Sequence, residues 1–279
     1  MINTNEKLTI LHSDNGVFVD GSSFMASFSR DSANIDYEYT EDFMFIGFYK
    51  PISALYFDFV KASNQSNLTL LIDYWNGTEF TSLPSFYDDT AVMTRSGFVT
   101  WDRNLDDEAK TTVNGTEQYW YRFNIDGITH AFQVNGINIV FSDDTDLKRE
   151  FFEVNQFLPT GQSSHIMTHE AARDEIIQAL NQKSGQIIDG NTGWEKNISA
   201  FDLLNVGQIK LASTYLVLSK IFLNVSDEVD DLYMEKSKIY RSKYNDIINN
   251  VTLEIDHDDD GKYDRIERNT FSYGLIKRL

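Results

Sequence analysis

The spacing of apolar residues changes once along the chain, and this change predicts two structural regions. Over residues 43–142 apolar and polar positions alternate, as at Leu55, Phe57 and Phe59, which is the pattern of half-buried β-strands. Several short strands at such spacing predict an antiparallel β-sandwich. We expect this N-terminal domain to span residues 1–150.

Asparagine–glycine pairs mark turns between the predicted strands. Asn76-Gly77 lies between two β-type segments, where a two-residue type I′ turn needs positive φ at both positions. Asn114-Gly115 is a further turn signal, because both residue types tolerate the left-handed conformation. We therefore expect a hairpin with a two-residue loop at Asn76-Gly77 and another turn at Asn114-Gly115.

After the Leu-Pro-Thr-Gly sequence at residues 158–161, the apolar spacing changes to the 3.6-residue period of helices. We predict one helix capped by Thr168, a second over residues 202–225 and a third after Ser226. Apolar residues on several sides of the second helix are typical of the central helix of a bundle. The short link after it places the second and third helices antiparallel. The expected fold class is α+β, with a helical domain at residues 151–279 following the sandwich.

Acidic residues outnumber basic ones by 43 to 24, which gives a formal net charge of −19. Such a surface repels phosphate, so we expect neither sequence-independent nucleic-acid binding nor binding to anionic membranes. No apolar run reaches the roughly 18 residues of a membrane span, and the N-terminus resembles no secretion signal. We therefore expect the protein to stay in the cytosol where it is made. The absence of cysteine excludes disulfides and thiolate chemistry.

The sequence DHDDDGKYDRIE at residues 256–267 has the ligand spacing of an EF-hand-type calcium loop. Gly261 falls at the sixth position, where the chain must turn sharply. A hard divalent cation would turn the mutual repulsion of the carboxylates into binding, so we predict a structural Ca²⁺ site. Its oxygen ligands would come from Asp256, Asp258, Asp260, the Lys262 carbonyl, Asp264 and Glu267.

A water-exposed acidic turn that holds no ion is the alternative for this segment. The eighth loop position is Tyr263, where aliphatic residues are common, and residues 251–255 before the loop alternate like a strand rather than a helix. The loop would then join the two strands of a short β-hairpin, and an Asp-Gly-rich turn between strands needs no ion.

No catalytic constellation stands out in the sequence. His165 and His169 are four residues apart and Glu170 follows, but the order is HxxxHE rather than the HExxH of a zinc-binding helix. If Thr168 caps the helix, the two rings do not share a face, so we interpret them as a surface pair. No nucleophile is paired with a base in any known motif, and we expect a protein that is not an enzyme.

Adjacent aromatic residues occur at Tyr74-Trp75 and at Tyr119-Trp120. Because neighbouring strand residues point to opposite faces, one ring of each pair should face the core and the other should face outwards. Core and interface packing is one use of these rings. The alternative is a sugar-binding face on the sandwich that uses Trp75 and Trp120.

Three helical segments precede the acidic loop: AARDEIIQAL at residues 171–180, SAFDLLNVGQIKLASTYLVLSKIF at 199–222 and LYMEKSKIYRSKY at 232–244. In order and composition they resemble head-to-tail connector proteins of tailed bacteriophages, also called adaptor or head-completion proteins. The stretch from YWNGTEFTSL to GTEQYWYRF is similar to a β-sandwich module of phage structural proteins. The simplest connector proteins are little more than the helical bundle, so the N-terminal β domain is a departure from the family.

The resemblance implies a structural protein of the virion neck, assembled in the host cytoplasm. Connector proteins form a ring, expected here to be twelvefold, that docks beneath the portal protein and surrounds the DNA channel. The ring would contact other neck or tail proteins, and DNA would pass through without specific binding. The C-terminal tail would reach the portal through Phe271, Tyr273, Leu275 and Ile276.

Two physical arguments agree with a ring. A conduit must not grip DNA, and acidic groups facing a lumen let phosphates slide past. A closed ring needs two different contact surfaces on each subunit, which the aromatic sandwich and the apolar tail could provide. The competing hypothesis is a carbohydrate-binding or host-recognition module of a phage tail or neck.

Overall fold

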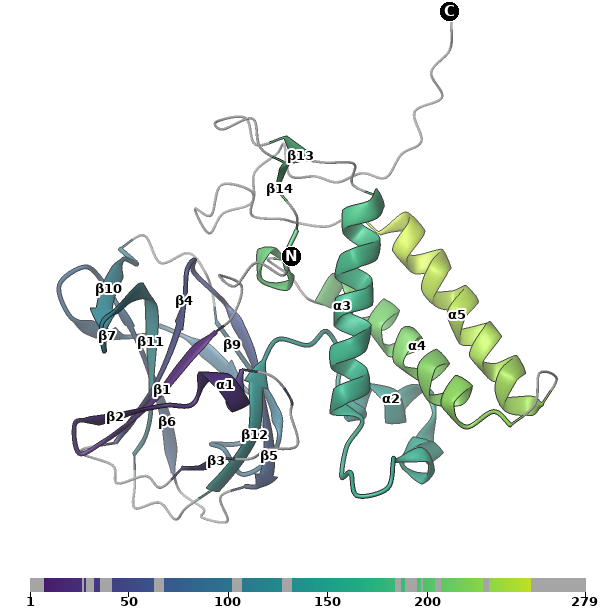
Figure 1. Cartoon of the computed structure of the whole chain (residues 1–279), viewed down its shortest axis with the longest axis horizontal. Helices are drawn as coiled ribbons and strands as arrows, with labels where there is room; N and C mark the ends of the chain where they lie inside the picture. The colour runs from purple at the N-terminus through teal and green to yellow at the C-terminus, as the bar shows by residue number, and fades with distance from the viewer. Residues whose placement is uncertain are drawn as a thin grey trace, which may run out of the picture. The chain divides into compact units, whose positions relative to one another are not determined.

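The chain divides into two compact units, Met1–Ile139 and Val140–Leu279. The first contains the two large sheets and the second the long helices (Figure 1), so the α+β class predicted from the sequence is confirmed. The computed structural model describes residues 8–26, 28, 33–35, 42–62, 68–101, 107–126, 132–183, 187–188, 195–196, 198–203, 207–227 and 231–251.

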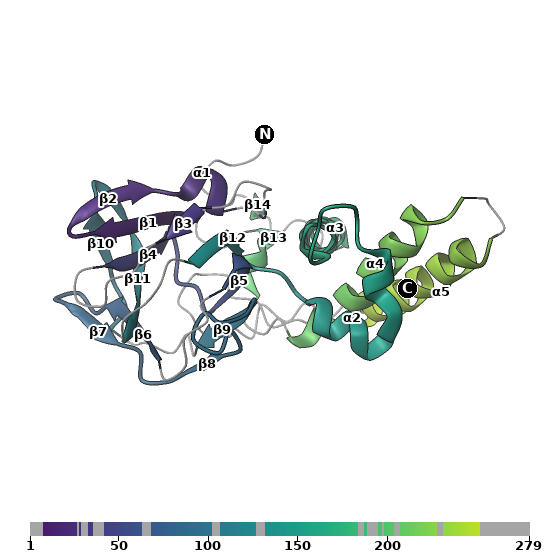
Figure 2. The ribbon, with the colours of Figure 1, turned by 90° about the horizontal axis from the view of Figure 1, so that it is seen from below.

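Two antiparallel sheets make up the first unit (Figures 1 and 2). Sheet A has the order β2 (Val17–Asp20), β1 (Thr9–Asp14), β4 (Phe43–Phe48), β11 (Thr116–Asp126), β6 (Thr69–Trp75) and β7 (Phe80–Ser82), and β10 (Lys110–Val113) also pairs with β11. Sheet B has the order β3 (Ala33–Ile35), β12 (Phe132–Asn138), β5 (Ala54–Lys61), β9 (Gly97–Trp101) and β8 (Phe86–Asp88). A short helix, α1 (Ser22–Met25), follows β2.

Aromatic side chains fill the space between the two sheets. Phe57 on β5 contacts Phe123 on β11 with ring centroids 5.5 Å apart, and Trp101 on β9 contacts Tyr121 on β11 at 5.0 Å. All four side chains are buried. Burial of large rings from facing sheets is the main stabilising contribution in such a core, and it confirms the predicted sandwich.

The Asn-Gly turn between β10 and β11 is confirmed by its backbone angles. Asn114 and Gly115 have φ of 47° and 81°, which are both in the left-handed region that a type I′ turn requires. Asn15 and Gly16, with φ of 51° and 79°, make the equivalent turn between β1 and β2. In both hairpins the residue types match the backbone conformation.

The two-residue loop expected at Asn76-Gly77 is wrong. Strand β6 ends at Trp75 and β7 begins only at Phe80, so the loop is longer. The Asn76 Oδ1 accepts hydrogen bonds from the backbone amides of Thr78 and Glu79, each at 2.9 Å. Asparagine therefore acts here through its side chain, which closes the loop in the manner of an Asx turn.

The loop between β8 and β9 contains three consecutive left-handed residues. Ala91, Val92 and Met93 have φ of 49°, 58° and 59°, a costly conformation for residues with a Cβ atom. The Asp88 carboxylate accepts from the amides of Thr90 and Val92 at 2.7 Å each, and Met93 is only 1% exposed. Hydrogen bonds and burial of one methionine therefore offset the backbone strain.

The second unit is built from three long helices and shorter elements: α2 (Asp144–Glu150), η2 (Phe152–Phe157), α3 (Ile166–Lys183), β13 (Ile187–Ile188), β14 (Glu195–Lys196), η3 (Ala200–Asp202), α4 (Gly207–Asn224) and α5 (Leu232–Asn250). Helices α4 and α5 form an antiparallel pair, and α4 also contacts α3 and α2 (Figure 1). Among the described residues, none of the helices combines the length and the apolar character that crossing a bilayer would require.

Helix α4 is the central helix, as the sequence predicted. Apolar side chains on several of its sides are buried, and Phe222 alone contacts rings from η2 and α5, with Phe157 edge-on at 5.6 Å and Tyr240 stacked at 5.7 Å. Helix α4 is thus the core of the second unit, because its neighbours bury their apolar sides against it. Its fully buried apolar residues are Ile209, Ala212, Leu216, Val217, Leu218 and Phe222.

Two boundaries differ from the sequence-based expectation. Helix α3 begins at Ile166, so Thr168 lies inside its first turn instead of capping it. The first unit ends near Ile139 rather than at residue 150. The reason is that Asp143 caps α2 by accepting from the amides of the first turn, while Leu147 on α2 is buried in the helical core.

A pair of leucines on α4 tests how far this core stabilises the fold. Leu216 is fully buried and Leu211 is 45% exposed. We expect Leu216→Ala to lower the free energy of unfolding by about 2–5 kcal/mol, because it removes buried methyl groups and leaves a cavity. Leu211→Ala should change it by about 0.5 kcal/mol or less. Urea unfolding followed by circular dichroism measures both, and equal effects would contradict the central position of α4.

Candidate functional site

Two groups of residues singled out in the sequence lie outside the described residues. The first is the predicted calcium loop, with Asp256, Asp258, Asp260, Lys262, Asp264 and Glu267, and the second is the tail, with Phe271, Tyr273, Leu275 and Ile276. In the part of the chain that the structure describes, His, Asp and Glu form no group of three that could hold a metal ion.

Trp75 and Trp120 lie on sheet A, on the face turned away from sheet B. Trp120 is 1% exposed, because it packs with Leu11, Phe45 and Val113 in a second apolar cluster on this outer face. Trp120 therefore cannot present its ring to a sugar, and that part of the alternative interpretation is wrong. Trp75 is half-buried and contacts Phe80 at 5.3 Å, so its ring remains partly accessible.

Aromatic rings on five strands of sheet A gather on its outer face, and two of them contact one arginine. The Arg122 guanidinium lies between two rings, 4.7 Å from the centroid of Phe43 and 4.9 Å from that of Phe80. Cation–π contacts of this kind strengthen when the cation is partly desolvated, and the Arg122 side chain is 26% exposed. We call this surface the outer aromatic face; it consists of Phe18, Phe43, Phe45, Trp75, Phe80, Trp120 and Arg122.

A carboxylate fixes the orientation of this arginine. The Asp73 Oδ2 accepts from Arg122 Nε at 3.0 Å and from Nη2 at 2.6 Å, and the Asp73 Oδ1 accepts from the Ser82 hydroxyl at 2.9 Å. Asp73 and Arg122 are directly opposite each other in the β6–β11 register, so the strand pairing itself brings the two charges together. The result is a neutral, pre-organised polar pair within an aromatic surface.

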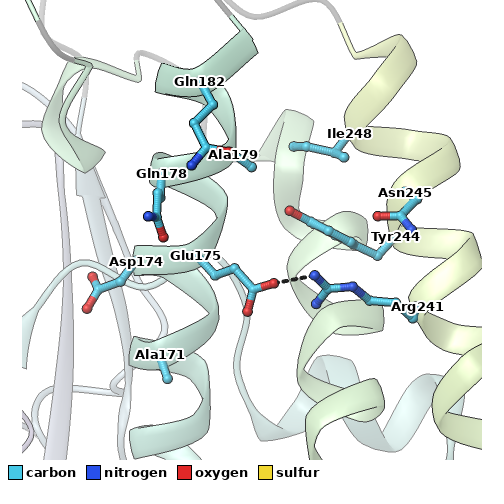
Figure 3. Close-up of a pocket in the computed structure, with 10 residues that line it drawn as sticks. All are labelled: Ala171, Asp174, Glu175, Gln178, Ala179, Gln182, Arg241, Tyr244, Asn245 and Ile248. Atoms are coloured by element: carbon cyan, nitrogen blue, oxygen red, sulfur yellow. Dashed lines mark ion pairs between the residues drawn. The ribbon is translucent and has the colours of Figure 1, made fainter.

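A groove of about 610 Å³ lies on the second unit between α3 and α5 (Figure 3). Glu175 on α3 crosses it towards α5, with its Oε1 2.5 Å from Arg241 Nη2, and its Oε2 is 2.6 Å from Lys220 Nζ on α4. Burial opposes ionisation of Glu175, but hydrogen bonds from Lys220 and Arg241 outweigh it and lower its pKa. One carboxylate thus links the three long helices, and Asp174, Gln178 and Tyr244 add polar groups to the groove wall.

The interpretation of His165 and His169 as a surface pair is wrong, because they are 1% and 0% exposed. The His169 Nε2 lies 3.2 Å from the Asp144 Oδ1, and its Nδ1 lies 3.0 Å from the Ser142 hydroxyl. Ser142 is also 2.8 Å from the Ser213 hydroxyl on α4. No sequence signal pointed to this network, because its members are separated by up to 71 residues and match no motif.

The order Asp144–His169–Ser142 has the connectivity of a nucleophile, a base and an orienting acid. Ser142 is 0% exposed and its hydroxyl is hydrogen-bonded to that of Ser213. Its oxygen is therefore enclosed by protein and is not presented to a substrate as a nucleophile would be. The network instead ties α2, α3 and α4 together through satisfied buried hydrogen bonds. His165 joins it through its backbone amide, which donates to the Asp144 carboxylate at 3.2 Å, and its Nε2 lies 3.3 Å from the Val154 carbonyl.

Burial and charge shift the pKa values of this network. Burial lowers the pKa of His165 below 6.5, and Asp144 only partly offsets this effect. Burial opposes ionisation of Asp144, but its hydrogen bond and charge contacts with His169 prevail and lower its pKa below 3.8. Burial raises the pKa of Asp143, helped by the charge of Asp146. The folded state therefore favours neutral His165 next to ionised Asp144.

Comparisons with known proteins give no family. No family model matches the chain, and no curated protein matches it. One solved structure, the Clostridium perfringens glycoside hydrolase CpGH89 in complex with its substrate GlcNAc-α-1,4-galactose, is similar over 64% of this chain and 20% of that chain, with 11% identity and a TM-score of 0.28. At this TM-score the likeness carries no argument about fold or function.

Acid should destabilise the second unit through His165. Because its pKa is lower in the folded state than in the unfolded state, the unfolded chain takes up the proton first as pH falls below about 6.5. We expect the free energy of unfolding to fall by up to about 1.4 kcal/mol per pH unit in this range. His165→Gln, which can still donate to Val154, should flatten the dependence.

Helical circular dichroism during urea unfolding at pH 5–7.5 provides the measurement. The raised pKa of Asp143 has the opposite effect, because it increases the free energy of unfolding as pH falls. The test is therefore the difference in slope between wild type and His165→Gln, and not the wild-type slope alone. An unchanged slope in His165→Gln would contradict the assignment.

Proposed function

We propose that this chain is a structural subunit of a head-to-tail connector of a tailed bacteriophage, which forms a ring at the portal vertex and extends the DNA channel. The observation that carries the proposal is that α5 has two unlike surfaces available for contacts with neighbours. One is a row of exposed aliphatic side chains, and the other is the edge of the α3–α5 groove.

The exposed row on α5 consists of Leu232 and Ile239, which are 62% and 56% exposed. They are seven residues apart and so lie on the same side of the helix. The groove residues Arg241 and Asn245 lie about half a turn around the helix from this row. Tyr244, which is buried against α4, lies between the core and the groove edge.

Two unlike surfaces are what a closed ring of identical subunits requires. In a ring each subunit uses one patch to contact the next copy and a different patch to contact the previous copy. Exposed leucine and isoleucine lose water when a neighbour covers them, which favours association by about 25 cal/mol per Å² of apolar area. The mixed polar and apolar groove supplies hydrogen-bonding groups and hence a fixed register.

The resemblance in the sequence supports the same function. The three segments that resemble connector proteins fold as α3, as η3 with α4, and as α5, all in one compact unit. The net charge of −19 is suited to a channel wall that does not bind phosphate. Under this proposal Phe271, Tyr273, Leu275 and Ile276 contact the portal, and the ring sits in the neck of the virion beside other neck or tail proteins.

Electron microscopy tests the ring directly. Purified protein or isolated virion necks should show closed rings, twelvefold by the resemblance. The double variant Leu232→Glu with Ile239→Glu should abolish rings while its circular dichroism spectrum stays that of the wild type, because both side chains lie on the surface. Val60→Glu, at a residue of the first unit that is 58% exposed, is the matched control. Monomers alone, together with absence from virion necks, would refute the proposal.

Calcium should stabilise the protein if the acidic loop binds it. A ligand that binds only the folded state raises stability in proportion to the logarithm of its concentration. We expect chelation by EDTA to lower the melting temperature, and Asp256→Ala to remove this sensitivity. Asn250→Ala, just before the loop, is the control and should remain sensitive. A melting curve that is identical with and without calcium would count against the site.

A further inference from the structure

The outer aromatic face has an unused hydrogen-bonding edge at its centre. Asp73 engages Nε and Nη2 of Arg122, whereas Nη1 has no hydrogen bond among the described residues. The ring centroids of Phe43 and Phe80 lie 4.7 and 4.9 Å from the guanidinium carbon, and the side chain is 26% exposed, so the N–H groups that Asp73 does not use remain as donors. Ser82 beside them is exposed and donates to Asp73, which leaves its oxygen lone pairs free to accept.

Half-buried rings lie next to this polar edge. Trp75 and Phe80 are opposite each other in the β6–β7 register, with their centroids 5.3 Å apart and their planes at 73°. Phe80 also contacts Phe45, which belongs to the buried cluster around Trp120. The rings are therefore held by packing on one side while Trp75 and Phe80 stay partly accessible, which gives a rigid apolar surface beside a donor and an acceptor.

We propose that this face binds a hexose unit of a neutral polysaccharide. The apolar side of the sugar ring would stack on the ring of Trp75 beside Phe80, while vicinal hydroxyls would accept from Arg122 Nη1 and donate to the oxygens of Ser82 and Asp73. A sugar hydroxyl both donates and accepts hydrogen bonds, so it matches a site that offers the Arg122 donor beside the Ser82 and Asp73 acceptors. Rings that are already ordered in the free protein lose little conformational entropy on binding.

Charge distinguishes a neutral sugar from other ligands. Asp73 neutralises Arg122 and the chain carries a net charge of −19, so an anionic ligand would be repelled. A protein partner that covered the face would have to remove the water that still reaches the ion pair, whose side chains are 26% and 14% exposed, and the cost of desolvating paired charges often exceeds the attraction between them. A sugar leaves part of the pair in contact with water and replaces the remainder with hydroxyl groups.

This proposal is independent of the ring. The sugar site uses only residues of the first unit, whereas the proposed subunit contacts use α3 and α5 of the second unit. A ring that binds no sugar, or a monomer that binds one, would separate the two proposals. In a virion such a site would hold a polymer on the surface of the bacterial host.

Native affinity electrophoresis of the full chain tests the site. The strongly acidic chain migrates readily, and gels cast with hydroxyethylcellulose, galactomannan or dextran offer β-glucosyl, mannosyl and α-glucosyl probes. We expect retardation by at least one of the three polymers and at least about a tenfold loss of affinity in Trp75→Ala, because an aromatic stacking contact is lost. Arg122→Gln should weaken binding similarly, and Arg122→Lys should not restore it, because lysine lacks the second planar donor.

The controls distinguish loss of the site from loss of the fold. Tyr87→Ala removes a ring that is 65% exposed on sheet B and should leave retardation unchanged. Trp75 lies at the edge of the cluster, so Trp75→Ala should retain the wild-type melting temperature to within a few degrees even if Arg122→Gln does not. Absence of retardation by all three polymers would overturn the proposal, as would retardation that survives Trp75→Ala and Arg122→Gln. Loss of ring assembly in Arg122→Gln without any sugar binding would show a protein interface instead.

Discussion

The enclosure of α4 by the rest of the second unit is the constraint on which the other features depend. Its side chains are apolar on several sides, so neighbours must cover it, and α3, α5 and the residues around α2 do so. Each of these neighbouring helices packs only one of its sides against α4. Helix α5 places Tyr244 and Ile248 against the core and keeps Leu232 and Ile239 in solvent. Under the proposed assembly, these two exposed aliphatic side chains are the ones that a neighbouring copy would cover.

Polar contacts in the same unit fix how the helices are arranged around α4. Glu175 joins α3 to both α4 and α5, and the buried chain from Asp144 through His169 and Ser142 to Ser213 joins α2 to α3 and α4. Apolar packing alone would tolerate sliding and rotation, whereas these bonds have one satisfied arrangement. The groove beside α5 therefore has a defined shape, which a contact of fixed register between subunits requires.

Periodicity predicted the architecture, because both patterns follow from burying one side of a regular element. The alternation at Leu55, Phe57 and Phe59 and the apolar residues of α4 located the sandwich and the central helix. The local sequence pattern gave wrong predictions of burial where contacts between residues distant in the chain determine it. Trp120 was a candidate for an exposed ring on a strand with one solvent-facing side, but a second apolar cluster on the outer face of sheet A buries it. His165 and His169 looked like a surface pair, and their hydrogen-bond partners Asp144 and Ser142 lie more than twenty residues earlier in the chain. The partnership of Arg122 with Asp73 depends on strand register, which the sequence alone did not provide.

The central claim is that the chain functions by assembling with copies of itself. Mass photometry of the purified protein over a range of concentrations measures this most directly. The account predicts one discrete species whose mass is a whole multiple of 32.1 kDa, about 385 kDa for twelve copies, and its loss when Leu232 and Ile239 are both replaced by glutamate. A single peak at the mass of one chain at every concentration, unchanged by that double replacement and by added portal protein, would contradict it.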